Sequence, residues 1–123
     1  PRRRGVTLPA VGNQDKGGHT MKRIIEGKLY DTKEATAIGE SSYSHPGDFD
    51  YVSETLYKTA NGAYFIAGEG GARSRYSRQV EQNTWSGGSD IRALTREEAF
   101  EWAEQHLDSD DVQAEFGDLV VPA

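Results

Sequence analysis

The chain contains no cysteine. This absence excludes disulfide bonds and thiolate metal ligands, and nothing in the composition indicates secretion. Long hydrophobic runs are also missing, because no apolar stretch approaches the roughly 20 residues that a membrane-spanning helix needs. We therefore expect a cytoplasmic protein with no membrane contact. With 123 residues, the chain is long enough for one domain with a modest core.

Positive charge is scarce and unevenly placed. The chain has 14 Lys and Arg against 20 Asp and Glu, which gives a formal net charge of -6. Residues 1–20 hold four basic residues and one acidic residue, so the remaining chain has 10 basic and 19 acidic residues. The acidic charge of residues 21–123 repels nucleic-acid phosphates and anionic membranes and attracts basic surfaces. The expected partner is therefore a basic protein surface, with no direct contact to nucleic acid.

The first 20 residues, PRRRGVTLPAVGNQDKGGHT, have no hydrophobic periodicity, and the only methionine, Met21, follows them directly. Residues 16–18 (KGG) can be encoded by AAG-GGA-GGT, which contains a ribosome-binding sequence, and the next two residues then supply the spacer before an ATG. We interpret residues 1–20 as a translated non-native leader or cloning remnant and assign residues 21–123 to a single domain. The alternative is a basic arm that binds a partner.

Residues 21–94 have short patterns that are typical of β-strands. Two apolar pairs in KRIIEGKLYD are separated by Glu26 and Gly27, which indicates either one bent strand or a tight turn. Alternation over residues 33–44 predicts a half-buried strand, residues 45–50 form a loop, and residues 89–94 are a last strand. The intervening glycine-bracketed stretch is long for a loop, and we place a short helix over residues 73–80.

The clearest local signal is Asn61-Gly62 within SETLYKTANGAYFIAGEG. These two residues can adopt the positive φ angles of a two-residue type I′ turn, which predicts an antiparallel hairpin. That register pairs Tyr57 with Ile66, Lys58 with Phe65 and Thr59 with Tyr64.

Two helices are expected at the C-terminal end. Thr95 is followed three residues later by Glu98, a capping box that starts the first helix. Ser109 is the expected N-cap of a second, shorter helix, and Gly117 is its expected C-terminal stop. The predicted fold class is α+β: a small antiparallel β-meander packed against two C-terminal helices.

Lys and Arg are absent between Glu97 and Asp118, a stretch with nine carboxylates. At about 100° per residue, the buried side of the first helix consists of Phe100, Ala103 and Leu107, flanked by Ala99, Trp102 and His106. The opposite side carries the four carboxylates that we name the acidic ridge: Glu97, Glu101, Glu104 and Asp108. Asp110, Asp111 and Glu115 extend it. The ridge is either a solvated helix face or a mimic of nucleic-acid phosphates that binds a groove lined by Lys and Arg.

Two further groups are candidate partner-binding residues. A second acidic cluster flanks the entry to the hairpin and consists of Asp48, Asp50 and Glu54. The glycine-rich segment GEGGARSRYSRQ places three arginines around an aromatic ring: Arg73, Arg75, Tyr76 and Arg78. Such a pattern either binds phosphates and bases or pairs with the acidic helix of the same or a neighbouring molecule. We favour the second interpretation, which leaves a homodimer open.

No catalytic or metal-binding pattern is present. None of the three histidines (His19, His45 and His106) lies at metal-ligand spacing from another, and there is no nucleophile elbow or HExxH motif. The glycines do not form a P-loop, because no G-K-[ST] follows them. We therefore expect no enzymatic activity, no metal and no cofactor. A small enzyme acting through the glycine-rich loop is the minority alternative.

Three stretches, GKLYDT, ETLYKTANGAYFIAGEGG and SGGSDIRALTREEAFEWAE, together with the acidic end, resemble a group of small proteins carried by bacterial phages, plasmids and conjugative elements. The likeness covers residues 21–107, and the group has no catalytic motif to carry over. The resemblance implies an inhibitor of host defence of the anti-CRISPR kind. Many such inhibitors are acidic and occupy the DNA- or guide-binding surface of the CRISPR effector.

We therefore expect a stoichiometric, non-enzymatic inhibitor. Its acidic surface would mimic nucleic-acid phosphates and block DNA binding by a Cas effector in the bacterial host cell. The alternative is a regulatory or antitoxin-like module of a mobile element, which would bind a protein through the loop from Arg73 to Arg78.

Overall fold

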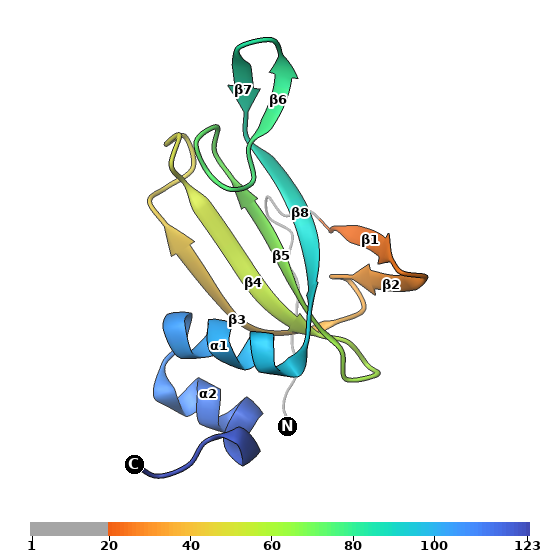
Figure 1. Cartoon of the computed structure of the whole chain (residues 1–123), viewed down its shortest axis with the longest axis vertical. Helices are drawn as coiled ribbons and strands as arrows, with labels where there is room; N and C mark the ends of the chain where they lie inside the picture. The colour runs from red at the N-terminus through yellow and green to blue at the C-terminus, as the bar shows by residue number, and fades with distance from the viewer. Residues whose placement is uncertain (1–19) are drawn as a thin grey trace.

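The computed structural model describes residues 20–123 (Figure 1). Its centre is a four-stranded antiparallel sheet with the order β3 (Thr36–Tyr43), β4 (Val52–Lys58), β5 (Tyr64–Gly70) and β8 (Gly88–Leu94). Two separate hairpins join it: β1 (Lys22–Ile25) with β2 (Lys28–Asp31), and β6 (Arg78–Glu81) with β7 (Thr84–Ser86). The chain ends in α1 (Arg96–His106), α2 (Ser109–Phe116) and the 3-10 turn η2 (Gly117–Leu119). This confirms the α+β class. The predicted leader lies outside the described residues, except for Thr20.

The β4–β5 hairpin is confirmed, but its predicted register is wrong by one residue. The observed pairs are Leu56 with Ile66, Tyr57 with Phe65 and Lys58 with Tyr64. Gly62 N donates to Thr59 O at 2.9 Å, and Gly62 alone in the loop has a positive φ, 88°. Asn61 keeps a negative φ, so the connection is a type I turn followed by a left-handed glycine, which makes a three-residue loop.

The β1–β2 hairpin resolves the open question over residues 22–31 in favour of a tight turn. Glu26 and Gly27 have φ angles of 53° and 80°, the two positive values that a type I′ turn needs. The hairpin covers one face of the main sheet, where Tyr30 meets Phe65 edge-on with ring centroids 5.5 Å apart. Its outer side stays apolar, because Ile24 is 70% exposed and Leu29 is 56% exposed.

The helix expected over residues 73–80 is absent from the described structure. Consecutive turns occupy residues 72–76, and strand β6 begins at Arg78. The β6–β7 hairpin then projects from the end of the sheet (Figure 1). Side chains along it are exposed, including Val80 and Trp85.

The start of α1 has the predicted cap, whereas the start and the end of α2 both differ from the prediction. Thr95 caps α1, and its reciprocal hydrogen bonds with Glu98 complete the capping box. The N-cap of α2 is Asp108, one residue before the expected Ser109, and its carboxylate accepts from Asp111 N at 2.9 Å. Gly117 does not stop the chain in the left-handed region, because it has a φ of -55° and continues into η2.

The helices cover the sheet face opposite the β1–β2 hairpin. The core between helices and sheet consists of Leu56, Tyr64, Ile66, Ala99, Trp102, Ala103, Val112 and Phe116. The second core, under the hairpin, consists of Tyr30, Phe65, Ala67 and Ile91. Successive residues of β5 thus enter opposite cores. Each fully buried Leu, Ile or Phe contributes about 1.5–3 kcal/mol to stability.

Candidate functional site

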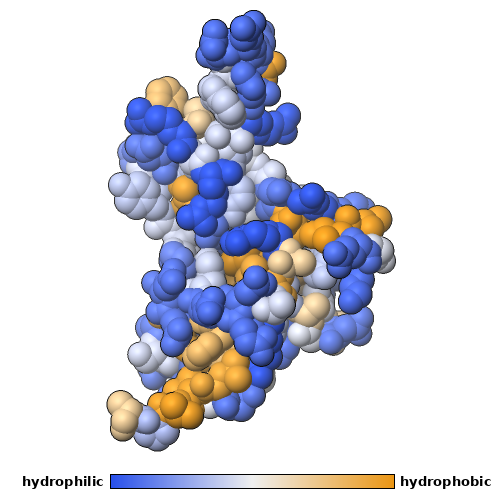
Figure 2. Space-filling view, in the orientation of Figure 1, coloured by the Kyte–Doolittle hydropathy of each residue, from blue (hydrophilic) through white to orange (hydrophobic). Residues whose placement is uncertain are grey.

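Three members of the acidic ridge lie on the outer side of α1, as predicted. Glu97, Glu101 and Glu104 are exposed, and the opposite side of the helix packs on the sheet through Ala99, Trp102 and Ala103. Within residues 20–123 none of these three carboxylates forms an ion pair. Hydrophilic side chains cover α1 in Figure 2.

The fourth member, Asp108, is placed differently from the prediction. Because α1 ends at His106 and Leu107 is extended, with φ -112° and ψ 161°, helical periodicity does not reach Asp108. The residue instead starts α2, beside the exposed Asp110 and Asp111. We name six exposed carboxylates the acidic face: Glu97, Glu101 and Glu104 of α1, with Asp108, Asp110 and Asp111 at the start of α2. None of the six has an ion pair within the described chain, and Glu98, which also has none, is left out because its side chain completes the capping box of α1.

The carboxylates of the acidic face repel one another where they are close. Burial raises the pKa of Asp111. Asp108 raises it further through its negative charge and its hydrogen bond with Asp111, and the negative charge of Asp110 also raises it. A cation brought near Asp111 would relieve this repulsion. The start of α2 is therefore suited to a positively charged neighbour.

Two carboxylates of the predicted stretch are neutralised within the molecule. Glu115 is half-buried, lies 2.9 Å from Lys58 Nζ and accepts a hydrogen bond from the Tyr64 hydroxyl. Both Asp118 oxygens accept from the Arg96 guanidinium. Glu115 was expected to belong to the binding surface, but its contacts attach α2 to the sheet. Because both cations lie outside the acidic stretch of the sequence, spacing along the chain did not reveal them.

Glu54 is buried, with a relative exposure of 3%, whereas sequence analysis placed it in a surface cluster. Trp102 Nε1 donates to its Oε1 at 2.9 Å, and the Tyr76 hydroxyl donates to its Oε2 at 2.6 Å. Arg75 NH1 lies 3.2 Å from the same Oε2. Burial raises the pKa of Glu54, but the hydrogen bonds from Tyr76 and Trp102 and the charges of Arg75 and Arg92 outweigh it, so the pKa is lowered.

This carboxylate joins three elements: strand β4, helix α1 and the loop before β6. Glycine makes the contact with the loop possible, because a Cβ on Gly68 would overlap the Tyr76 hydroxyl. A sequence signal for the burial existed, since Glu54 lies two residues from the core residue Leu56 and strand residues two apart share a face.

The arginine-rich loop is largely engaged inside the molecule. Arg73 forms a two-point contact with Asp50, with both nitrogen–oxygen distances 3.1 Å. Arg75 and Tyr76 bind Glu54. Of the three arginines in this segment, Arg78 alone has no ion pair with another described residue. Arg73 and Arg75 thus pair with acids of the second cluster of the same molecule. Within the described chain they do not pair with the acidic helix, which was the interpretation that we favoured.

Asp48 shapes the loop between β3 and β4. It accepts from the Ser44 hydroxyl at 2.5 Å and from Asp50 N at 2.9 Å, and these two hydrogen bonds lower its pKa. The nearby ring of Phe49 is 61% exposed, and the Arg73 guanidinium carbon lies 5.5 Å from its centroid.

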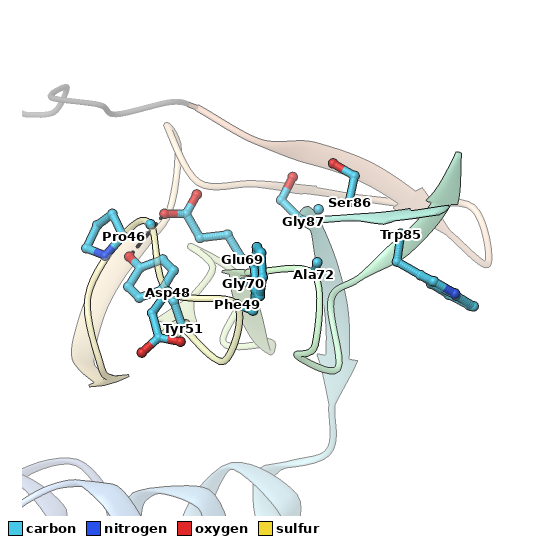
Figure 3. Close-up of a pocket in the computed structure, with 14 residues that line it drawn as sticks. Pro46, Asp48, Phe49, Tyr51, Glu69, Gly70, Ala72, Trp85, Ser86 and Gly87 are labelled. Carbon is cyan, nitrogen blue, oxygen red and sulfur yellow. Dashed lines mark hydrogen bonds between the residues drawn. The ribbon is translucent and has the colours of Figure 1, made fainter. Parts of the chain in front are cut away.

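A groove of about 570 Å³ opens at the end of the sheet far from the helices (Figure 3). Its walls are residues 46–49 with Tyr51, residues 69–72 and residues 85–89. Figure 3 shows the Tyr51 hydroxyl directed toward the Glu69 carboxylate, whereas the Trp85 side chain points away from the other labelled residues. Sequence analysis did not predict this groove.

One serine–histidine contact is present outside the groove. Ser41 Oγ lies 3.1 Å from His106 Nδ1, and the His106 ring lies 4.8 Å from that of Trp102. A catalytic dyad also needs a group that orients the second ring nitrogen, and none within residues 20–123 is hydrogen-bonded there. In the described chain no group of three His, Asp or Glu residues could hold a metal ion. None of its helices is both long and apolar enough to cross a membrane.

Comparison of the chain with models of known protein families, with curated proteins and with solved structures finds no match.

Proposed function

We propose that the protein is a non-enzymatic inhibitor that binds a basic, nucleic-acid-binding protein through its acidic face. The observation that carries the proposal is the distribution of ion pairs. Five cations of the described chain pair with acids elsewhere: Arg23 with Asp90, Lys58 with Glu115, Arg73 with Asp50, Arg75 with Glu54 and Arg96 with Asp118. The acidic face has none of them, so a partner's Lys and Arg side chains would meet carboxylates that are not already paired within these residues.

The spacing of the carboxylates supports a mimic of a few phosphates. Cβ atoms of residues three or four apart on a helix are about 5–6 Å apart, so Glu97, Glu101 and Glu104 form a short row of three charges on α1. The acidic face therefore imitates part of one strand in charge rather than a whole duplex. The long side chains of Lys and Arg on a partner's surface can reach such a row of carboxylates.

The target class that we propose is a CRISPR effector in the bacterial host cytoplasm. Support comes from the resemblance to small proteins of mobile elements and from the net charge of -6. Bound stoichiometrically in the DNA channel of a Cas protein, the acidic face would exclude the target duplex. The antitoxin-like alternative has less support, because Arg73, Arg75 and Tyr76 already bind acids of their own chain.

A DNA-binding assay tests this proposal. The full chain is added to purified effector complexes, and the affinity for a labelled target duplex is measured at low and at moderate salt. We expect loss of DNA binding that weakens as salt rises, because the contacts are between exposed charges. Unchanged DNA binding and cleavage across the CRISPR types would contradict the proposal.

A further inference from the structure

The two edges of the main sheet differ in how they are covered. At the β8 edge, the Arg23 guanidinium of the β1–β2 hairpin donates to Ile91 O at 3.0 Å and to the Asp90 carboxylate at 2.6 Å. Strand β3 forms the other edge (Figure 1), and among the described residues only β4 pairs with it. An edge strand presents a row of backbone N–H and C=O groups with which a further strand can pair. The β3 edge is therefore open to strand addition.

The register of β3 defines where a strand could be added. Its pairing with β4 is irregular between Ala37 and Gly39 and then runs residue by residue from Gly39 to Tyr43. Residues 39–43 thus present a continuous edge beyond the bulge. Strand β3 contains neither proline nor lysine, two residues with which proteins often prevent pairing at an edge.

The helix-facing side of this edge is partly apolar. Gly39, Ser41 and Tyr43 share a face because side chains alternate along a strand. Ser41 Oγ lies 3.1 Å from His106 Nδ1 of α1. Atoms of the Leu107 side chain occupy the space that a Cβ on Gly39 would need. The half-buried Leu107 and the Tyr43 ring, which is 69% exposed, are therefore available to an apolar side chain on an added strand.

Glu40 gives the other side of the edge a negative charge. Burial raises the pKa of Tyr57, and the negative charge of Glu40 raises it further, so this charge acts on that side of the sheet. Glu40 has no ion pair within residues 20–123, and β3 contains no Lys or Arg. Antiparallel pairing with a second copy would bring a second Glu40 to the same edge, where like charges repel. A basic side chain is favoured beside Glu40 instead.

The open edge is continuous with the acidic face. Strand β3 contacts the end of α1 through His106 and Leu107, and Asp108 of the acidic face follows Leu107 directly. A segment paired with β3 would therefore lie beside carboxylates on both sides of the sheet. Exposed charges of opposite sign steer such a segment to the edge, and backbone hydrogen bonds then fix its position.

We propose that the β3 edge binds, by strand addition, an extended segment of the partner in which basic residues alternate with apolar ones. The basic side chains would lie beside Glu40, and the apolar side chains would cover Tyr43 and Leu107. This inference rests on the proposed function for the identity of the partner, and it adds backbone pairing to the charge contacts of the acidic face.

An NMR titration tests the proposal with two probes of equal charge. One is a capped seven-residue peptide of alternating lysine and valine, and the other is the same peptide with every backbone nitrogen methylated. Each is added at low salt to the full, isotopically labelled chain. We expect the backbone amide signals of residues 39–43 to shift saturably with the first peptide. The methylated peptide should bind there about 10-fold more weakly or not at all, because it has lost its backbone donors.

Matched variants separate this edge from general charge effects. Glu40→Lys reverses the charge beside the edge and should weaken the unmethylated peptide about 2- to 5-fold. Glu81→Lys makes the same change of net charge at an exposed residue of the β6–β7 hairpin and should leave the affinity unchanged. Equal affinities of the two variants would show that Glu40 does not select the basic residue.

Four results would overturn the proposal: no shift with the first peptide, equal affinity of both peptides, shifts confined to α1 and α2, or shifts of residues 39–43 that follow protein concentration without peptide. The third result would assign basic segments to the acidic face alone, and the fourth would assign the edge to a second copy. The titration contains no effector and no DNA, so its failure is distinct from a failure of the proposed inhibition.

Discussion

The indole nitrogen of Trp102 donates a hydrogen bond of 2.9 Å to Glu54 Oε1, which joins helix α1 to the middle of the sheet. The other carboxylate oxygen accepts from Tyr76 and holds the loop before β6. One buried carboxylate thus positions both helix α1, which carries three members of the acidic face, and the loop that leads toward the groove. Its removal should disturb both.

Glu54→Ala should lower the free energy of unfolding by about 3 kcal/mol, because it leaves the Trp102 and Tyr76 donors without an acceptor inside the protein. Glu54→Gln keeps one acceptor oxygen and should cost about 1–2 kcal/mol. Urea unfolding followed by tryptophan fluorescence measures both losses. If Glu54→Ala were as stable as the wild type, the carboxylate would not be what joins the two elements.

Acid should destabilise the protein. The pKa of Glu54 is below its ordinary value of 4.5, and contact with Arg96 lowers the pKa of Asp118 to about 2. A carboxylate with a depressed folded pKa stabilises the fold above its unfolded pKa, and this stability is lost as pH falls through the folded value. We expect an unfolding free energy that is steady above pH 5 and falls from there toward pH 2.

The variant Asp118→Asn isolates one part of this dependence. It removes the titrating group from the Arg96 contact, so its unfolding free energy should fall less steeply with acid than that of the wild type. Urea unfolding at a series of pH values compares the two proteins. Identical slopes would show that Asp118 makes no contribution to the pH dependence.

Gly68→Ala should destabilise the fold by about 1–3 kcal/mol, because the added Cβ would overlap the Tyr76 hydroxyl and force Tyr76 away from Glu54. Gly117→Ala is the matched control. Its Cβ would meet open space and its φ is -55°, so we expect a gain of about 0.4–1 kcal/mol. Thermal unfolding distinguishes the two, and equal effects would exclude the steric explanation.

The sequence predicted the elements better than their pairing. Asn61-Gly62 correctly located the β4–β5 turn, but the register slipped by one residue. Strand β5 is buried on both faces, so the hydrophobic pattern that normally fixes a register carried no information there. The three-residue loop is closed by a hydrogen bond from Ala63 N to Thr59 Oγ1 at 3.0 Å, a contact that the predicted two-residue turn did not include.

The candidate site was predictable only where it depends on one helix. Periodicity placed Glu97, Glu101 and Glu104 together on the outer side of α1, which the structure confirms. Glu54 contacts Arg75, Tyr76 and Trp102, which lie 21, 22 and 48 positions away in the sequence. Asp118 contacts Arg96, which lies 22 positions away. Such distant contacts depend on how the strands and helices pack, and no local pattern signals them.

A comparison of charge-reversed variants tests the proposal that the acidic face binds a basic channel. Glu101→Lys with Glu104→Lys alters the face, whereas Glu34→Lys with Glu81→Lys makes the same change of net charge at exposed residues outside the helices. Each protein is added to an effector complex that the wild type inhibits, and target-DNA binding is measured. We predict that the helix variant loses inhibition while its unfolding free energy changes by no more than about 0.5 kcal/mol, and that the control variant inhibits like the wild type. Full inhibition by the helix variant would show that the acidic face is not the binding surface.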